Sequence, residues 1–135
     1  MHPLVHIILG LLFAVLLKLL TSFTILQIAI ILLAAVFIDV DHWFVYVLKK
    51  KSFSIRGSYE WFIEISKKKT HPVFLCIFHT IEFMLFLVWL SFKFMFFELV
   101  LVGFIFHIAL DVIDSVRKHE YGKEISLIYA VLRRK

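Results

Sequence analysis

The chain consists mainly of long apolar runs separated by short polar segments. Four runs approach the length of about 20 apolar residues that a helix needs to cross a hydrocarbon core about 30 Å thick. They cover approximately residues 4–20, 23–48, 72–90 and 94–115. The breaks at residues 21–22 and 91–93 are short, so the runs are expected to pair as antiparallel helical hairpins. The pattern therefore predicts an all-α, polytopic membrane protein, a four-transmembrane-helix bundle forming a single domain over residues 1–135.

Composition supports a membrane protein. Hydrophobic residues make up 62% of the chain, whereas a soluble domain has about 45–50% apolar residues. This excess excludes a soluble enzyme, a disordered tail and a secreted disulfide scaffold. Cys76 is the only cysteine, so it cannot form an intramolecular disulfide, and its position in an apolar run favours a packing role.

The basic residues indicate how the chain is oriented. Of the 15 Lys and Arg residues, seven lie in the loop at 49–70 and six in the tail at 116–135. Short basic segments beside membrane spans remain on the cytoplasmic side. We therefore expect a multi-pass protein of the inner or plasma membrane with both termini in the cytoplasm. Within the basic loop, residues 58–65 have the pattern of a short amphipathic helix lying at the membrane surface.

Ionisable side chains inside the predicted spans are the strongest functional signal, because a charge within a bilayer costs several kcal/mol. They fall in the cytoplasmic half of the spans, several of them about 9–15 Å from the boundary that the basic residues mark. The set consists of His6, Asp39, Asp41, His42, His79, Glu82, His107, Asp111 and Asp114.

Helical spacing groups these residues. His107, Asp111 and Asp114 follow an i, i+4, i+7 pattern and form one stripe. Asp39 and His42 share a face, as do His79 and Glu82. Asp41 would point away from Asp39 in a regular helix, so one of the two aspartates is expected outside the direct ligand set.

A bound metal ion is the most economical counter-charge for these carboxylates, since no Lys or Arg lies at their depth. Mixed His and Asp ligands suit Zn²⁺ or Mn²⁺ better than Ca²⁺ or Mg²⁺, which prefer oxygen ligands. We predict one or two divalent ions, with zinc favoured over manganese. A single intramembrane histidine has an ordinary alternative, and His6 could equally pack against a neighbouring carbonyl.

Several motifs resemble one known family. The chain carries His-x3-Gly at 6–10, Asp-x-Asp-His at 39–42, a His-rich start of the third run, and Gly-x3-His-x3-Asp at 103–111. In order and spacing this resembles the membrane-bound metal-dependent hydrolases, also described as LexA-binding, inner-membrane-associated hydrolases. The resemblance extends from His6 to Asp114 and implies a metal-dependent hydrolase.

The third run departs from the family pattern. Many members carry His-Arg-Gly-x-Thr-His-Ser, whereas residues 69–73 read Lys-Thr-His-Pro-Val and residues 78–80 read Phe-His-Thr. Either His71 or His79 could therefore be the ligand. We favour His79, because it lies deeper and shares a face with Glu82.

The hypothesis of a membrane-embedded hydrolase assigns a role to each candidate residue. His42, His79, His107 and Asp111 would be the core ligands, Asp39 or Asp41 would complete or bridge the site, and His6 is a further candidate ligand. Asp41 or Glu82 would accept a proton, and Asp114 would orient His107 or Asp111. Arg56, Lys67 and His71 are candidates to bind an anionic headgroup. The expected substrate is a lipid or another membrane-associated phosphoester.

Other functions remain open. A transporter of divalent metal or protons would need a polar path through the outer half of the spans, where few polar residues occur. A non-catalytic membrane binding protein could hold a purely structural metal. DNA or repressor binding is least favoured, because the basic loop contains no nucleic-acid motif, and we expect no nucleic-acid partner. A homodimer is a possible assembly.

Overall fold

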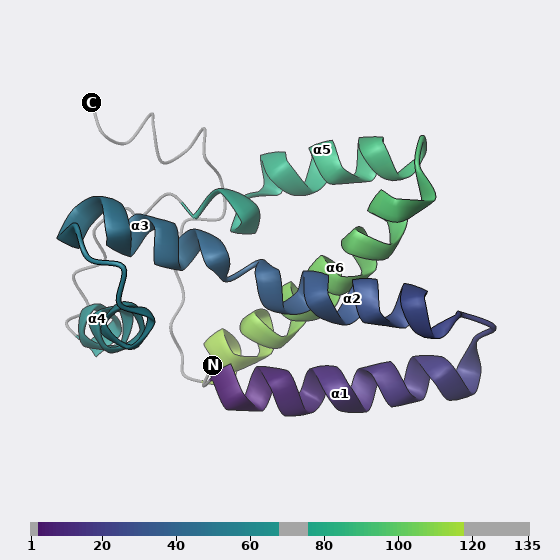
Figure 1. Cartoon of the computed structure of the whole chain (residues 1–135), viewed down its shortest axis with the longest axis horizontal. Helices are drawn as coiled ribbons and strands as arrows, with labels where there is room; N and C mark the ends of the chain where they lie inside the picture. Colours follow the sequence, from purple (N-terminus) through teal and green to yellow (C-terminus); the bar gives the residue numbers. More distant parts are fainter. Residues whose placement is uncertain (1–2, 68–75, 118–135) are drawn as a thin grey trace. The chain divides into compact units, whose positions relative to one another are not determined.

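Every regular element in the described part of the chain is helical (Figure 1). The computed structural model describes residues 3–67 and 76–117. In chain order the elements are α1 (Pro3–Leu20), α2 (Ile25–Phe37), α3 (Val40–Lys50), α4 (Ile55–Lys67), the 3-10 turn η1 (Ile77–His79), α5 (Ile81–Ser91) and α6 (Met95–Arg117). The all-α prediction is confirmed for these residues.

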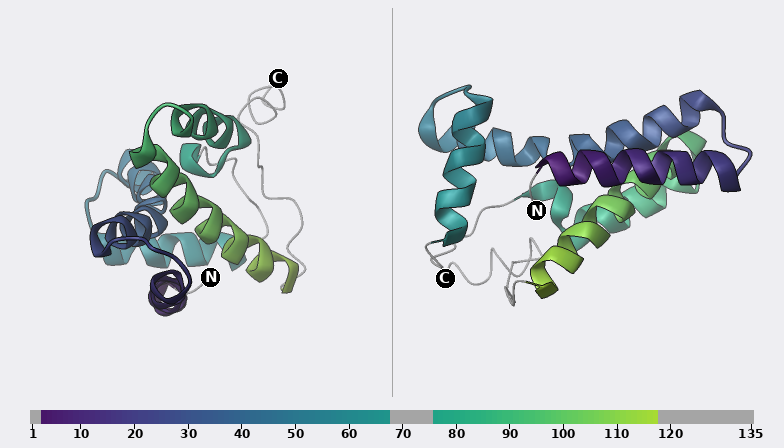
Figure 2. Two further views of the ribbon diagram at one scale, coloured as in Figure 1. Left: turned by 90° about the vertical axis from the view of Figure 1, so that its right-hand side faces the viewer. Right: turned by 90° about the horizontal axis from the view of Figure 1, so that it is seen from below.

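The described residues belong to two compact units. Of these residues, the first unit contains 3–38 and 84–117, and the second unit contains 39–67 and 76–83. In the first unit α2 packs against both α1 and α6, and Figure 2 shows α1 and α2 side by side. A capping box begins α2: the Thr24 hydroxyl accepts a hydrogen bond from the Gln27 backbone N–H, and the Gln27 side chain accepts one from the Thr24 N–H.

Gly103 allows α6 to approach α2 closely. A Cβ atom at this position would overlap the backbone carbonyl oxygen of Ile31 and would lie 2.9 Å from the Ala34 Cβ. Ile31 and Ala34 are buried here together with Phe104. The close approach matters for the site, because His107 follows Gly103 by one helical turn on the same side of α6.

In the second unit α3 and α4 pack against each other. Lys51 ends α3 in the left-handed conformation, with φ of 52°, and its N–H donates to the Val47 carbonyl at 2.8 Å. The chain then turns into α4, where the Trp61 ring lies 5.6 Å from the Tyr46 ring, centroid to centroid. The predicted helix over residues 58–65 is thus present as part of α4, and its position at a membrane surface remains a prediction.

Among the residues that the structure describes, two stretches are long and apolar enough to cross a membrane: Ile25–Lys50, which comprises α2 and α3, and Met95–Asp114 within α6. α1 is apolar but shorter, and the 11 residues of α5 rise only about 16 Å at about 1.5 Å per residue. Residues 72–75, the start of the third predicted span, lie outside the described residues. These lengths support membrane association, whereas the number of crossings remains a prediction.

The second predicted span is not one regular helix. The chain leaves α2 after Phe37, turns at Ile38 and Asp39, and enters α3 at Val40. Asp39 occupies the position before the first residue of α3. Helical spacing does not apply across this turn. The directions of the Asp39 and Asp41 side chains therefore do not follow from their spacing in the sequence.

The predicted shared face of His79 and Glu82 is wrong. His79 ends η1, and Thr80 is extended, with φ of −88° and ψ of 148°. The Thr80 hydroxyl oxygen accepts a hydrogen bond from the Phe83 N–H at 3.3 Å, as an N-cap residue does, so α5 begins only at Ile81. His79 and Glu82 therefore lie on different elements.

Candidate metal-binding groups

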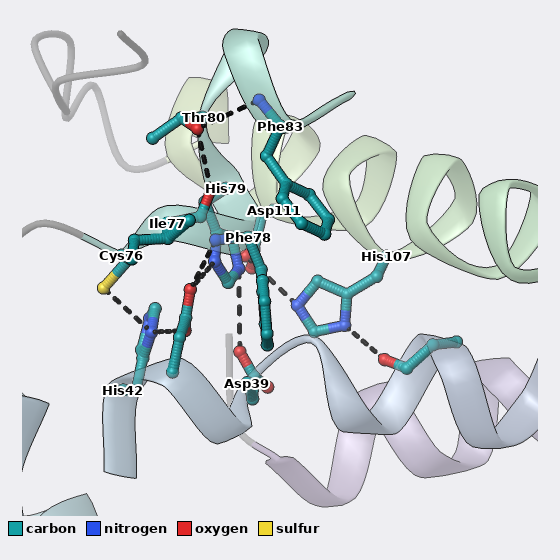
Figure 3. A network of polar contacts seen from close by, with 12 residues as sticks. Asp39, His42, Cys76, Ile77, Phe78, His79, Thr80, Phe83, His107 and Asp111 are labelled. Atoms are coloured by element: carbon teal, nitrogen blue, oxygen red, sulfur yellow. Dashed lines mark hydrogen bonds and ion pairs between the residues drawn. The ribbon is translucent and has the colours of Figure 1, made fainter. Parts of the chain in front are cut away.

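In the first unit, two histidines and one aspartate from α1 and α6 form the His6–His107–Asp111 group. The carboxylate oxygens of Asp111 lie 3.4 Å from His6 Nε2 and 3.4 Å from His107 Nε2, and Figure 3 shows the contact between Asp111 and His107. One potential ligand atom from each residue lies within 4.8 Å of the other two. Residues far apart in the chain thus converge at the spacing of a metal site.

The two imidazole rings of this group are stacked. Their centroids are 4.4 Å apart and their planes differ by 16°. His107 is buried, with 1% exposure, and the His6 side chain retains only 10%. Asp111 keeps 26% of its side chain exposed. The histidines are therefore largely shielded, while the carboxylate remains accessible from outside the core.

A backbone hydrogen bond orients His107. Its Nδ1 lies 2.7 Å from the carbonyl oxygen of Ala35, and because a carbonyl only accepts, Nδ1 carries the proton. A neutral His107 ring then directs the lone pair of Nε2 toward the Asp111 carboxylate. Lone pairs of a nitrogen and of a carboxylate repel each other, so this arrangement calls for a cation or a proton between them.

The second unit contains the Asp41–His42–His79 group, centred on a buried carboxylate. Asp41 has 7% exposure, and its oxygens lie 2.7 Å from His42 Nδ1 and 3.2 Å from His79 Nδ1. The backbone N–H of Phe78 donates to the same carboxylate at 3.0 Å. Potential ligand atoms of the three side chains again lie within 4.8 Å of one another.

Asp39 and Asp41 approach opposite nitrogens of the same ring. Asp39 Oδ1 lies 3.8 Å from His79 Nε2 (Figure 3), whereas Asp41 Oδ2 lies near His79 Nδ1. Asp41 was expected to point away from Asp39 in a regular helix. The turn at Ile38–Asp39 removes that regularity and directs both carboxylates toward His79.

The contact between Cys76 and His42 was not predicted from the sequence. The cysteine sulfur lies 3.1 Å from His42 Nδ1 (Figure 3). The apolar neighbours of Cys76 in the sequence favoured a packing role, and the partner is 34 positions away. One signal was present, because Cys-x2-His at 76–79 resembles the short spacings between zinc ligands.

The other predicted site residues do not join either group in the described chain. Glu82 lies in the first turn of α5, and Asp114 lies one turn beyond Asp111 on α6. Arg56 is exposed on α4, and its Nε–H donates a hydrogen bond of 2.8 Å to the Glu60 carboxylate, which raises the pKa of Arg56. Lys67 ends α4, but its side chain and all of His71 lie outside the described residues.

No protein-family model, no curated protein and no solved structure matches this chain. The resemblance to membrane-bound hydrolases therefore rests on the motifs of the sequence. The geometry of the two groups is the structural basis for assigning chemistry to them.

Proposed function

We propose that the chain is a membrane-embedded, metal-dependent hydrolase that acts on a lipid or another membrane-associated phosphoester. The observation that carries the proposal is the convergence of His6, His107 and Asp111. Catalytic zinc sites use three protein ligands, often two histidines and a carboxylate, and leave a fourth position for water. In the part of the chain that the structure describes, this group offers such a set.

The orientation of His107 supports metal binding. Ala35 fixes the proton on Nδ1 through the 2.7 Å hydrogen bond, so Nε2 is available as a ligand. Metal-binding histidines commonly donate their second nitrogen to a carbonyl or carboxylate in this way. A divalent ion in this position, zinc or manganese, would lower the pKa of a bound water and polarise the ester under attack.

Asp114 is the predicted catalytic carboxylate that belongs to the same helix as this group. It follows Asp111 by three residues on α6, a spacing that keeps both side chains on one face. We assign it to orienting Asp111 or accepting a proton. Asp41 and Glu82 remain predicted proton acceptors, and Arg56, Lys67 and His71 remain predicted headgroup contacts.

The membrane arrangement belongs to the same proposal. Two apolar stretches of sufficient length among the described residues support membrane association. The four apolar runs of the sequence and the basic segments at 49–70 and 116–135 are the basis for proposing four spans with both termini in the cytoplasm. A lipid headgroup can enter the cytoplasmic half of such a bundle more readily than a large soluble substrate. This favours a membrane-associated phosphoester as the substrate.

Metal content of the detergent-purified protein tests the ligand assignment. We expect wild type to retain about one ion of zinc or manganese at the His6–His107–Asp111 group, and Asp111→Asn to lose it. Glu98→Gln is the matched control, because it also removes a carboxylate from α6, at an exposed position. Equal metal content in all three proteins would contradict the assignment, and bound iron would point away from hydrolysis.

Release of phosphate from lipid phosphoesters in mixed micelles tests the activity. We expect wild type and Glu98→Gln to release phosphate. Chelation of the metal should stop this activity, and addition of zinc or manganese should restore it. Asp111→Asn should fall at least about a hundredfold, the scale of loss when a group stabilising the transition state is removed. Retained metal without any phosphate release would favour a binding or transport protein instead.

A further inference from the structure

We propose that Cys76 provides a thiolate ligand and, with Asp41, His42 and His79, forms a zinc site in the second unit. This goes beyond the proposed function, because the ion would be held by residues other than the His6–His107–Asp111 group, and Asp41 would bind it in place of accepting a proton. The motifs that carry the resemblance to metal-dependent hydrolases do not include this cysteine.

Several donor atoms of this group already lie at short distances from one another. His42 Nδ1 is 2.7 Å from Asp41 Oδ1 and 3.1 Å from Cys76 Sγ, and Asp41 Oδ2 is 3.2 Å from His79 Nδ1. Potential ligand atoms of Asp41, His42 and His79 lie within 4.8 Å of one another, whereas zinc–ligand bonds of about 2.0–2.3 Å place neighbouring ligand atoms about 3.3–3.5 Å apart. Binding would therefore rearrange these side chains around the ion, with the Cys76 sulfur moving in from its contact with His42.

One nitrogen of His42 faces two other donor atoms. Nδ1 lies next to both the Asp41 oxygen and the Cys76 sulfur. Without a metal ion, a single Nδ1–H would be shared between these two atoms, and the sulfur of a thiol is only a weak acceptor. A cation at the centre would attract the nitrogen, the carboxylate oxygen and a thiolate sulfur together.

The 3-10 turn η1 presents two of the ligands together. Cys76 precedes the turn and His79 ends it, and the His79 N–H donates to the Cys76 carbonyl at 3.1 Å. In a 3-10 turn the side chains at i and i+3 eclipse each other. The Cys-x2-His spacing therefore brings sulfur and imidazole to one side of the turn, facing Asp41 and His42.

The ligand set selects the ion. Thiolate is a soft ligand that favours Zn²⁺ over Mn²⁺ and Mg²⁺, and two histidines are compatible with zinc. The negative charges of the thiolate and of Asp41 balance the two positive charges of the ion. The site would therefore be neutral overall, as a buried position such as Asp41 requires.

Cobalt substitution tests the proposal on the full chain in detergent. A sulfur-to-cobalt charge-transfer absorption in the near ultraviolet can arise only from Cys76, since the chain has one cysteine. We expect the absorption in wild type and its loss in Cys76→Ser. We also expect it to be lost or strongly weakened in His79→Gln, which keeps the thiol. Absence of the absorption in wild type, or its full retention in His79→Gln, would overturn the proposal.

Alkylation of Cys76 gives a second measurement that needs no cobalt. Zinc at ten times its dissociation constant should slow the reaction of wild type with iodoacetamide about tenfold, and equal concentrations of Mg²⁺ or Mn²⁺ should have little effect. Equal rates with and without zinc, or equal protection in His79→Gln, would contradict the shared site.

The two proposals can be contradicted independently of each other. Asp111→Asn should lose one ion and keep the cobalt–sulfur absorption, whereas Cys76→Ser should lose the absorption and keep the ion at the His6–His107–Asp111 group. Absence of phosphate release by the wild-type protein, with the absorption intact, would overturn the hydrolase assignment alone.

Discussion

His107 uses its two ring nitrogens for different contacts. Nδ1 donates to Ala35, which lies in the last turn of α2, and Nε2 faces Asp111. The last four carbonyls of a helix have no partner within that helix. The His107 ring thus donates a hydrogen bond to one of the terminal carbonyls of α2 and directs its second nitrogen toward Asp111.

Two substitutions at His107 should separate these contacts. The amide nitrogen of Asn is two bonds from Cβ, as Nδ1 is, so His107→Asn can keep the Ala35 hydrogen bond while losing Nε2. His107→Gln reaches farther and leaves the buried carbonyl without this donor. We expect both variants to lose the ion, and His107→Gln to lower the free energy of unfolding by about 1 kcal/mol more than His107→Asn.

Thermal unfolding in detergent, together with metal content, checks this expectation. Equal destabilisation by the two variants would mean that the Ala35 contact contributes little. Full metal retention in His107→Asn would remove Nε2 from the ligand set.

At the scale of single residues, the sequence predicted partners on one element better than partners between elements. His107 and Asp111 are four residues apart on a helix, and their predicted contact is present. The Ala35 carbonyl could not be predicted, because a backbone group has no residue type to identify it. The sulfur of Cys76 reaches His42 only because η1 replaces the expected helix.

At the scale of elements, the apolar runs predicted that helices form and missed where they stop. An apolar run looks the same on either side of a short break, so hydrophobicity alone cannot locate the turn at Ile38–Asp39. The polar residues did carry a signal. Asp and Thr are preferred at the start of a helix, and Asp39 and Thr80 stand directly before α3 and α5.

Gly103 and Gly10 offer a matched pair that tests the packing of α6 on α2. In Gly103→Ala the new methyl group meets the Ile31 carbonyl, which is backbone and cannot move alone. In Gly10→Ala the nearest atom is the end of the flexible Leu32 side chain, at 3.1 Å. We expect Gly103→Ala to lower the free energy of unfolding by about 1–3 kcal/mol, and Gly10→Ala to have a much smaller effect.

Metal content of the two glycine variants links this packing to the site. Displacing α6 from α2 should separate His107 from Ala35, so Gly103→Ala should retain less metal than Gly10→Ala. Equal stability and equal metal content would show that α6 can shift without disturbing the ligands.

At the scale of the whole molecule, the described surface is strongly apolar. Around the turn between α1 and α2, Leu19, Leu20, Ile25 and Leu26 are each more than 70% exposed. Such a surface is suited to contact with lipid. Composition predicted this property well, because it depends on the whole chain more than on any particular contact.

Single-cysteine labelling tests the predicted topology. In a Cys76→Ser background, Ser52→Cys lies in the basic loop, and Phe92→Cys lies in the turn between α5 and α6, where Phe92 is 85% exposed. A membrane-impermeant maleimide applied to intact spheroplasts should label Phe92→Cys. It should label Ser52→Cys only after lysis. Labelling of both positions in intact spheroplasts would contradict the four-span arrangement with a cytoplasmic basic loop.

The stacked pair of His6 and His107 also has a consequence for how the protein is made. During synthesis the first helix is complete long before residues 107 and 111 exist, so an ion cannot be held by all three ligands until α6 has been added. Once bound, the ion would close a loop of most of the chain and restrict the unfolded ensemble as a crosslink does. Metal supply would then influence the last step of assembly as well as the chemistry that follows.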